Sequence, residues 1–269
     1  HSIHTMEFVF EETRKRSLNA IPVTGINRNS NYQNVVKKIV SKDKLGLCIR
    51  IEKSDFPDIN NKLTDKLSFF SIKRENVDLI IDLGFIKSKD NNENYLEVVG
   101  LINSISLIQQ WRSLTVVASS FPVSPISIKT STIGQLNRDE WSIWSKLYTN
   151  RLELKRMPTF GDYTITNPVY KEIDPRFMKQ TANIRYTSDT YWLVVKGLVI
   201  KNNGWGQMKN LCKLLVGLTE YCGETFSWGD KYIADCSNDL VPCLTATIWR
   251  AVGTNHHIMF VVNQLSNLP

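Results

Sequence analysis

The 269-residue sequence lacks the motifs that identify several common enzyme classes. No GxGxxG follows its first strand-like segment, and neither a P-loop nor a GxSxG sequence occurs in it. These absences argue against a dinucleotide-binding domain, a P-loop nucleotide hydrolase and an α/β-hydrolase. No other motif specifies catalysis, so whether the chain is an enzyme stays open at this point.

The sequence also has few cysteines and no long apolar run. Its five cysteines form no CxxC pair and no zinc-type spacing, which argues against a disulfide framework and a structural metal. No apolar run approaches 18 residues, and the first six residues resemble neither a signal peptide nor a lipidation site. We therefore expect a cytoplasmic protein with reduced thiols.

What the sequence does have is an excess of positive charge. Lys and Arg number 33 against 26 Asp and Glu, which gives a net charge of +7. A basic protein attracts anionic partners such as nucleic acid at long range. The basic residues are spread along the chain, however, so a solvated, mildly basic surface is the plainer interpretation.

Hydrophobic segments alternate between extended and helical periods. Strands are expected over 18–25, 45–51, 77–83, 113–119, 159–165, 190–196, 246–252 and 258–262, with a further candidate at 6–10. Helices are expected over 31–41, after Ser54, over 95–111, after the capping box of Asn137 and Glu140, and over 208–218, whereas 173–185 reads as irregular.

Alternating strands and helices predict an α/β fold with a mostly parallel sheet. About seven such units suit a single TIM-like (β/α) barrel domain over residues 1–269, incomplete or irregular in places. An open doubly wound sheet is the runner-up. The candidate strand at 6–10 is too close to the next one for a crossover helix, so either that pair is antiparallel or chain segments are absent between the two.

Active sites of such barrels lie at the C-terminal ends of the strands. The polar residues there include Asp82, Asp162 and His256, which are our candidates for acid–base catalysis or for binding a divalent metal. The plainer interpretation is that Asp82 accepts backbone N–H groups in a turn, that Asp162 forms a salt bridge with Arg185 or Arg250, and that the histidines are neutral loop residues. No spacing specific for a metal is present.

Other residues are candidates for holding an anionic ligand. Lys196 and Arg250 lie at the C-terminal ends of predicted strands, and Trp205 lies in the Asn-Asn-Gly-Trp-Gly loop, where an exposed indole stacks readily on a base. Trp192 and Trp249 lie inside predicted strands, so core packing is the better explanation for them.

The segments Phe160–Tyr163 and Ala182–Thr187, followed by Trp192 and the strand to Lys196, resemble the bacterial and phage beta protein family. The specific part of the resemblance covers about 40 residues. The resemblance implies a barrel-like fold and a setting in prophages, mobile elements and phage defence, but no catalytic residues. It adds Tyr163, Arg185 and Tyr186 to the ligand-binding candidates, as one cluster at the barrel mouth or as a structural staple between strands.

Three functions follow, in order of preference. The first is a defence protein that binds nucleic acid or a phage protein through a basic barrel mouth. The second is a metal-dependent phosphodiester hydrolase or nuclease that uses Asp82, Asp162 and His256; only this one needs a divalent metal. The third is a non-catalytic subunit of a larger assembly, with an operon-encoded protein as partner.

Overall fold

The structure is a computed structural model that describes residues 4–87, 91–169, 180–243 and 245–268. The chain forms two compact units. Unit 1 comprises residues 1–118 and 140–162, and unit 2 comprises residues 119–139 and 163–269.

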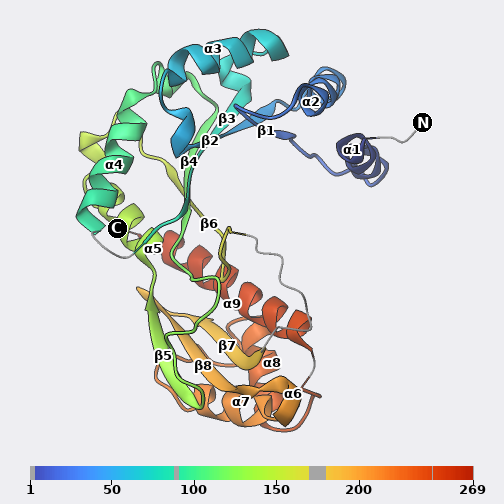
Figure 1. Cartoon of the computed structure of the whole chain (residues 1–269), viewed down its shortest axis with the longest axis vertical. Helices are drawn as coiled ribbons and strands as arrows, with labels where there is room; N and C mark the ends of the chain where they lie inside the picture. Colours follow the sequence, from blue (N-terminus) through green and yellow to red (C-terminus); the bar gives the residue numbers. More distant parts are fainter. Residues whose placement is uncertain (1–3, 88–90, 170–179, 244, 269) are drawn as a thin grey trace. The chain divides into compact units, whose positions relative to one another are not determined.

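Unit 1 is built on a five-stranded sheet in the order β1-β2-β3-β4-β6 (Figure 1). The β1–β2, β2–β3 and β4–β6 pairs are parallel. Its elements are α1 (Thr5–Lys15), β1 (Val23–Gly25), α2 (Ser30–Asp43), β2 (Leu47–Glu52), α3 (Ile59–Phe70), β3 (Val77–Phe85), α4 (Asn91–Ser104), β4 (Ser113–Ser119), α5 (Asp139–Thr149) and β6 (Thr159–Asp162), with short 3₁₀ turns at Lys53–Asp55, Arg74–Asn76, Ile108–Gln110 and Arg151–Glu153.

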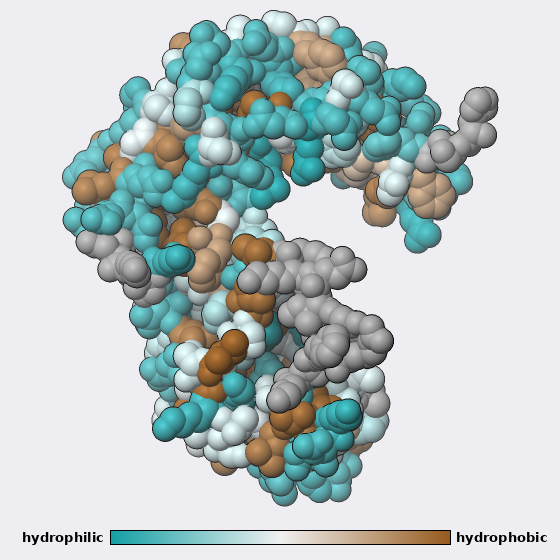
Figure 2. Space-filling model, viewed as in Figure 1, coloured by the Kyte–Doolittle hydropathy of each residue, from teal (hydrophilic) through white to brown (hydrophobic). Residues whose placement is uncertain are grey.

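The apolar strands of unit 1 are buried, as expected for a parallel sheet whose faces are covered by helices. Leu47, Ile49 and Ile51 of β2 are fully buried, and Ile81 of β3 lies beside Ile51 in the register. The helices bury one stripe and leave the other to solvent, so the surface over α3 is largely hydrophilic (Figure 2).

Unit 2 contains a three-stranded antiparallel sheet in the order β5-β8-β7. Its elements are β5 (Thr132–Asn137), β7 (Thr181–Thr187), β8 (Tyr191–Val199), α6 (Ile200–Asn203), α7 (Met208–Val216), α8 (Trp228–Ser237) and α9 (Ala246–Ser266).

The two faces of the unit 2 sheet are covered differently. Alternate residues of β7 and β8, such as Tyr186 and Leu193, pack against α7, α8 and α9 in one core cluster. The opposite face, which includes Trp192 and Val194, packs against Phe121 and other residues of the loop before β5. The period-two alternation of the strands therefore separates two small cores.

Glycines let α8 and α9 approach their neighbours closely. A Cβ on Gly229 of α8 would lie 2.4 Å from the carbonyl oxygen of Val252 in α9. A Cβ on Gly253 of α9 would lie 2.8 Å from the carbonyl oxygen of Arg185 in β7. These contacts fix how near α9 comes to both α8 and the sheet.

Three strand predictions are wrong. The segment 6–10 lies within helix α1, where its apolar residues pack on α2. The segments 246–252 and 258–262 belong to the single helix α9. In α9 the buried positions include Trp249, Val252, Gly253 and His256, a helical spacing that Gly and His obscure in the sequence because they are not apolar. The strands β5 and β7 and the helix α8 were not predicted.

The α/β class and most elements are confirmed. The strand predicted at 113–119 coincides with β4, and the helix predicted at 31–41 lies inside α2. The predicted irregular segment 173–185 falls partly outside the described residues, and its last part is β7. None of the described helices combines the length and the apolar composition that a bilayer crossing requires.

Two glycine substitutions are expected to change stability in opposite directions. Gly229→Ala forces its Cβ against the α9 backbone and should lower the free energy of unfolding by about 1–3 kcal/mol. Gly100→Ala in α4 meets nothing within 4 Å and should raise it by up to about 1 kcal/mol, because Ala favours a helix. Urea unfolding measures both. Equal effects of the two changes would contradict the close approach of α8 and α9.

Candidate functional site

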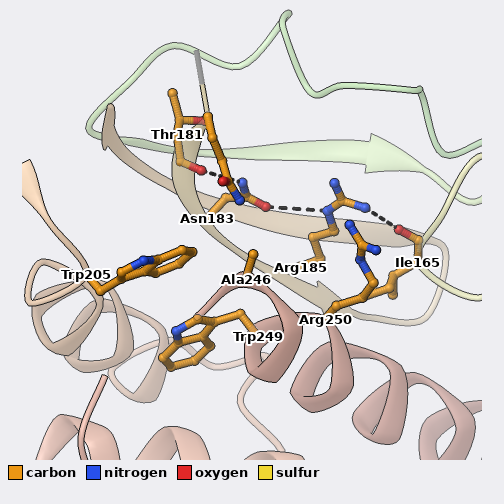
Figure 3. A pocket seen from close by; sticks show the side chains of 9 residues that line it. Ile165, Thr181, Asn183, Arg185, Trp205, Ala246, Trp249 and Arg250 are labelled. Carbon is orange, nitrogen blue, oxygen red and sulfur yellow. Dashed lines mark hydrogen bonds between the residues drawn. The ribbon is translucent and has the colours of Figure 1, made fainter. Parts of the chain in front are cut away.

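Unit 2 contains a pocket into which residues from β7, the loop after α6 and α9 converge (Figure 3). It has a volume of about 60 Å³ open to water-sized groups, enough for a few waters or one small anionic group. The described residues that line it are Ile165, Gln180, Thr181, Asn183, Arg185, Trp205, Ala246, Trp249 and Arg250. No Asp or Glu occurs among these lining residues.

Arg185 projects into the pocket from β7, and hydrogen bonds hold its guanidinium group in place. Its Nη1 donates to the carbonyl oxygen of Ile165 at 2.7 Å, and its Nε donates to Oδ1 of Asn183 at 3.4 Å. Its Cζ lies 4.6 Å from the ring centroid of Phe121. Among the described residues nothing accepts from Nη2, so this N–H group is available to a ligand.

Arg250 reaches the same pocket from α9 and lies beside Arg185 (Figure 3). Burial, together with the neighbouring charge of Arg250, lowers the pKa of Arg185 to about 10. Arg185 is therefore charged at neutral pH, beside the guanidinium group of Arg250. An anion bound between them would relieve their mutual repulsion, which makes the pocket suited to phosphate or carboxylate.

Two indoles form the apolar part of the pocket. Trp249 of α9 is buried, and Trp205 is half-buried in the loop after α6. Both lie toward the end of the pocket away from Arg250 (Figure 3). An aromatic face beside two cationic groups is the combination that binds the bases and phosphates of single-stranded nucleic acid.

Three of the six predicted ligand-binding residues, Arg185, Trp205 and Arg250, thus share one pocket. The other three lie outside its lining. Lys196 is buried in β8, where its Nζ donates to the carbonyl oxygens of Pro125 at 2.9 Å and Ile128 at 2.7 Å and so holds the loop before β5.

Tyr163 and Tyr186 have other places in unit 2. Tyr163 is half-buried in the turn after β6, where its carbonyl oxygen accepts from the hydroxyl of Thr166 at 2.7 Å. Tyr186 neighbours Arg185 in β7, but its side chain points to the opposite face of the strand. There it joins a buried polar network.

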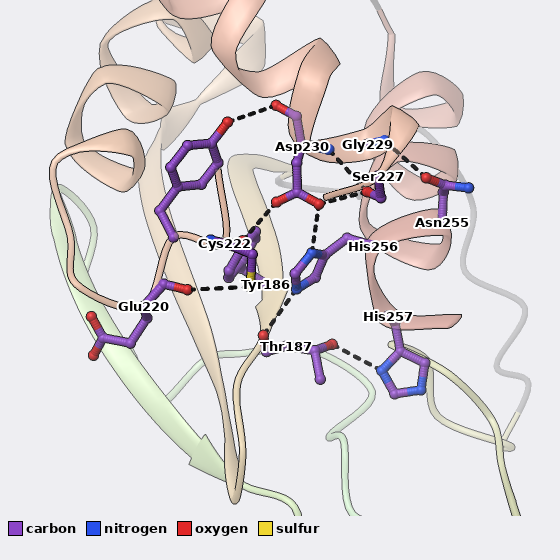
Figure 4. Close-up of polar contacts among 11 residues, drawn as sticks. Tyr186, Thr187, Glu220, Cys222, Ser227, Gly229, Asp230, Asn255, His256 and His257 are labelled. Atoms are coloured by element: carbon purple, nitrogen blue, oxygen red, sulfur yellow. Dashed lines mark hydrogen bonds and ion pairs between the residues drawn. The ribbon is translucent and has the colours of Figure 1, made fainter. Parts of the chain in front are cut away.

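At the centre of this network Asp230 of α8 binds His256 of α9 (Figure 4). Both residues are 0% exposed. Oδ1 of Asp230 accepts from the Tyr186 hydroxyl at 2.6 Å, and Oδ2 accepts from the Ser227 hydroxyl at 2.5 Å. The Tyr186 ring also stacks on the His256 ring at a centroid distance of 3.7 Å.

The geometry assigns both ring protons to His256. Its Nδ1 lies 2.9 Å from Oδ2 of Asp230, and its Nε2 lies 2.9 Å from the carbonyl oxygen of Thr187. Burial raises the pKa of Asp230, but the hydrogen bond and charge of His256, with Ser227 and Tyr186, outweigh it and hold that pKa below its ordinary value. Carboxylate and carbonyl oxygens only accept, so both ring nitrogens donate and the pair is an ion pair.

His257 follows on the same helix and is also buried. Its Nδ1 lies 2.8 Å from Oγ1 of Thr187. Both histidines lie in the helix α9 rather than in a loop, and both face the end of β7 (Figure 4).

The three catalytic candidates have separate environments. Asp82 lies in the buried part of β3 in unit 1, where Oδ2 accepts from Nε of Arg50 at 2.5 Å and Oδ1 accepts from the Gly84 N–H at 2.8 Å. Asp162 ends β6 in the same unit and is half-buried. His256 belongs to unit 2, and both its ring nitrogens are engaged there. Across the part of the chain that the structure describes, no group of three or more His, Cys, Asp or Glu side chains is placed to hold a metal ion.

The predicted gathering of polar residues at strand ends holds within unit 1. Arg50 of β2 contacts both Asp82 and Glu52, which are neighbours in the β2–β3 register. Arg50 and Glu52, but not Asp82, border a cavity of about 200 Å³ at the C-terminal ends of β1 and β2, which Asp55 also lines. Here Arg50 already pairs with carboxylates, whereas the described lining of the unit 2 pocket contains none.

Sequence reasoning missed Asp230 and Asn183 and assigned Trp249 to the core alone. Ser227 caps α8 by accepting from the Asp230 N–H at 3.1 Å. A Ser followed three residues later by an acidic residue is a signature of a helix start, so this signal could have identified α8. Nothing in the sequence pairs Asp230 with His256, which is 26 residues away.

Asp230→Asn is expected to destabilise the protein by about 3–5 kcal/mol, because it leaves a buried imidazolium without its counter-ion. Asp235→Asn, on the same helix, breaks a pair whose Lys231 partner is solvent-exposed and should cost about 1 kcal/mol or less. Urea unfolding at neutral pH measures both.

The contribution of Asp230 to the free energy of unfolding also depends on pH and decreases in acid. Because the folded pKa lies below the ordinary carboxyl value of about 4, the stabilisation is complete above that value and is lost as the pH falls through the folded pKa. The gap between wild type and Asp230→Asn should therefore narrow below about pH 4. The ion pair would be contradicted if the two proteins differed little in free energy of unfolding at neutral pH, or if their difference stayed constant down to acid pH.

Comparison with known proteins gives one match. The family model described as Beta protein matches residues 1–263, nearly the whole chain. No curated protein and no solved structure matches the chain.

Proposed function

We propose that this chain, which belongs to the Beta protein family, binds single-stranded nucleic acid through the pocket of unit 2. One observation carries the proposal. Two arginines, Arg185 and Arg250, converge with the indole of Trp205 in a pocket whose described lining has no carboxylate. The net charge of +7 adds long-range attraction for a polyanion.

The size of the pocket favours one phosphate group rather than a whole nucleotide inside it. A phosphate placed between the guanidinium groups can accept from Arg250 and from Nη2 of Arg185, for which the described residues supply no acceptor. The neighbouring base would then lie over Trp205, which requires a base that is free of its own stack. Single strands offer such bases and duplexes do not, so single strands should bind more tightly.

This ligand fits the defence role that the family resemblance suggests. In that role the nucleic acid comes from an invading phage or mobile element, and the protein engages it in the cytoplasm. A phage protein with an exposed acidic segment would use the same arginines but would not need Trp205. The sequential parallel order β1-β2-β3-β4-β6 supports a barrel-like architecture for unit 1, whereas the proposed ligand site lies wholly in unit 2.

Arg185→Ala and Arg250→Ala are each expected to weaken binding of a fluorescent single-stranded oligonucleotide about tenfold or more, since each removes charge-assisted hydrogen bonds. Lys213→Ala removes the same charge from an exposed site on α7 and is the matched control. Fluorescence anisotropy over a salt series should show that each arginine variant also lowers the salt slope by about 0.7.

Trp205→Ala separates nucleic acid from an acidic protein segment as the ligand. Loss of a stacked base should weaken oligonucleotide binding by about 1–3 kcal/mol and leave the salt slope unchanged. Absence of binding at low salt, or equal affinities of the arginine variants and Lys213→Ala, would contradict the proposal. Plaque counts on cells expressing wild type or the Arg185→Ala and Arg250→Ala double variant test the defence role with the same proteins.

A further inference from the structure

Two cysteine sulfurs lie in contact in the core cluster of unit 2 that also includes Trp249. Sγ of Cys236, in the last turn of α8, is 2.9 Å from Sγ of Cys243, in the segment that leads into α9. A disulfide bond is about 2.05 Å long, so the two sulfurs need to approach by less than about 1 Å to bond. Both thiols are free in this structure.

The backbone around the pair is held in place. After α8 the chain turns back through Asp239, whose φ of 66° is in the left-handed region. The Leu240 N–H donates to the carbonyl oxygen of Asp235 at 2.9 Å. The hydroxyl of Tyr232 in α8 donates to the carbonyl oxygen of Pro242 at 2.8 Å. Cys243 is therefore returned to the helix turn that carries Cys236.

The pair also has the electrostatics of a reactive thiol. A hydrogen bond from Cys212 lowers the pKa of Cys236, and although burial opposes it, the contact with Cys243 adds to the lowering and brings that pKa to about 7. A large fraction of the pair is thus thiolate at neutral pH, the form that reacts. Cys236 is fully buried, whereas Cys243 is partly exposed and gives small oxidants access.

We propose that Cys236 and Cys243 form a reversible disulfide that regulates the ligand pocket. The bridge would tie the end of α8 to the segment three residues before Ala246, where α9 begins. Trp249 and Arg250 lie on the first turn and a half of α9 and line the pocket. The ring of Trp249 also contacts Tyr232, at a centroid distance of 5.6 Å. Fixing the start of α9 therefore fixes the spacing between Arg250 and Arg185.

Hydrogen peroxide is the oxidant that the chemistry requires. The Cys236 thiolate attacks one oxygen of a peroxide that enters beside the partly exposed Cys243; the O–O bond breaks and hydroxide leaves, which gives a sulfenic acid on Cys236. The Cys243 thiol then attacks the Cys236 sulfur and loses its proton, the S–O bond breaks, and a second hydroxide leaves. With the two thiol protons the balance is two thiols and one peroxide giving one disulfide and two waters. A dithiol reductant reverses it.

The first test is a peptide map of the full chain after peroxide, with mass spectrometry. We expect a peptide pair linked through Cys236 and Cys243 that disappears on reduction. Cys243→Ser should abolish the link, whereas Cys222→Ser, which changes another partly exposed thiol, should leave it intact. A disulfide from Cys236 to Cys212, or no disulfide at all, would overturn the proposed bridge between Cys236 and Cys243.

The second test concerns the pocket, and this part rests on the proposed function. Oxidised and reduced wild type are compared for binding the same single-stranded oligonucleotide, with Cys243→Ser as a protein that cannot switch. Because the bridge pre-organises the start of α9, we expect the oxidised form to bind about fivefold more tightly. Equal affinities with the disulfide in place would overturn the regulation. Failure of both forms to bind would count against the proposed function alone, because the peptide map judges the disulfide independently.

Discussion

The buried ion pair of Asp230 and His256 is the interaction on which unit 2 depends. It joins α8 to α9, and through Tyr186 and the carbonyl oxygen of Thr187 it joins both helices to β7. A buried charge pair is favourable only when further hydrogen bonds satisfy it. Here the carboxylate and the imidazolium have such partners on three elements, so the network fixes the relative position of those elements rather than merely adding stability.

That position decides what the opposite face of β7 can do. Arg185 and Tyr186 are neighbours in β7, so a strand that turns Tyr186 toward the ion pair must turn Arg185 the other way. Gly253 lets α9 approach the backbone at Arg185, and Arg250 stands nearly one turn earlier on the same helix. The two guanidinium groups are thus brought together by packing and not by attraction. The free energy of their repulsion is what an anionic ligand recovers when it binds.

The parts of the fold that follow from local pattern could be predicted from the sequence. The continuous apolar runs predicted β2, β3 and β4, and Asp82 lies in β3 beside Glu52 of β2. The sequence also predicted part of the site, because residue type, resemblance and loop position singled out Arg185, Trp205 and Arg250.

The rest of the fold and site depends on tertiary contacts. Helix α9 was read as two strands because its β-branched residues favour extended structure, and because its buried face includes Gly253, His256 and His257, which are not apolar. The ion pair that explains why histidines are buried there links residues whose proximity only the folded chain reveals.

The central claim is that unit 2 places two arginines and an indole around one phosphate and one base. A crystal structure of the protein with a short single-stranded oligonucleotide tests it most directly. The account predicts a phosphate group between the guanidinium groups of Arg185 and Arg250 and a base against Trp205. A strand that lies elsewhere on the protein while this pocket holds only water would contradict it.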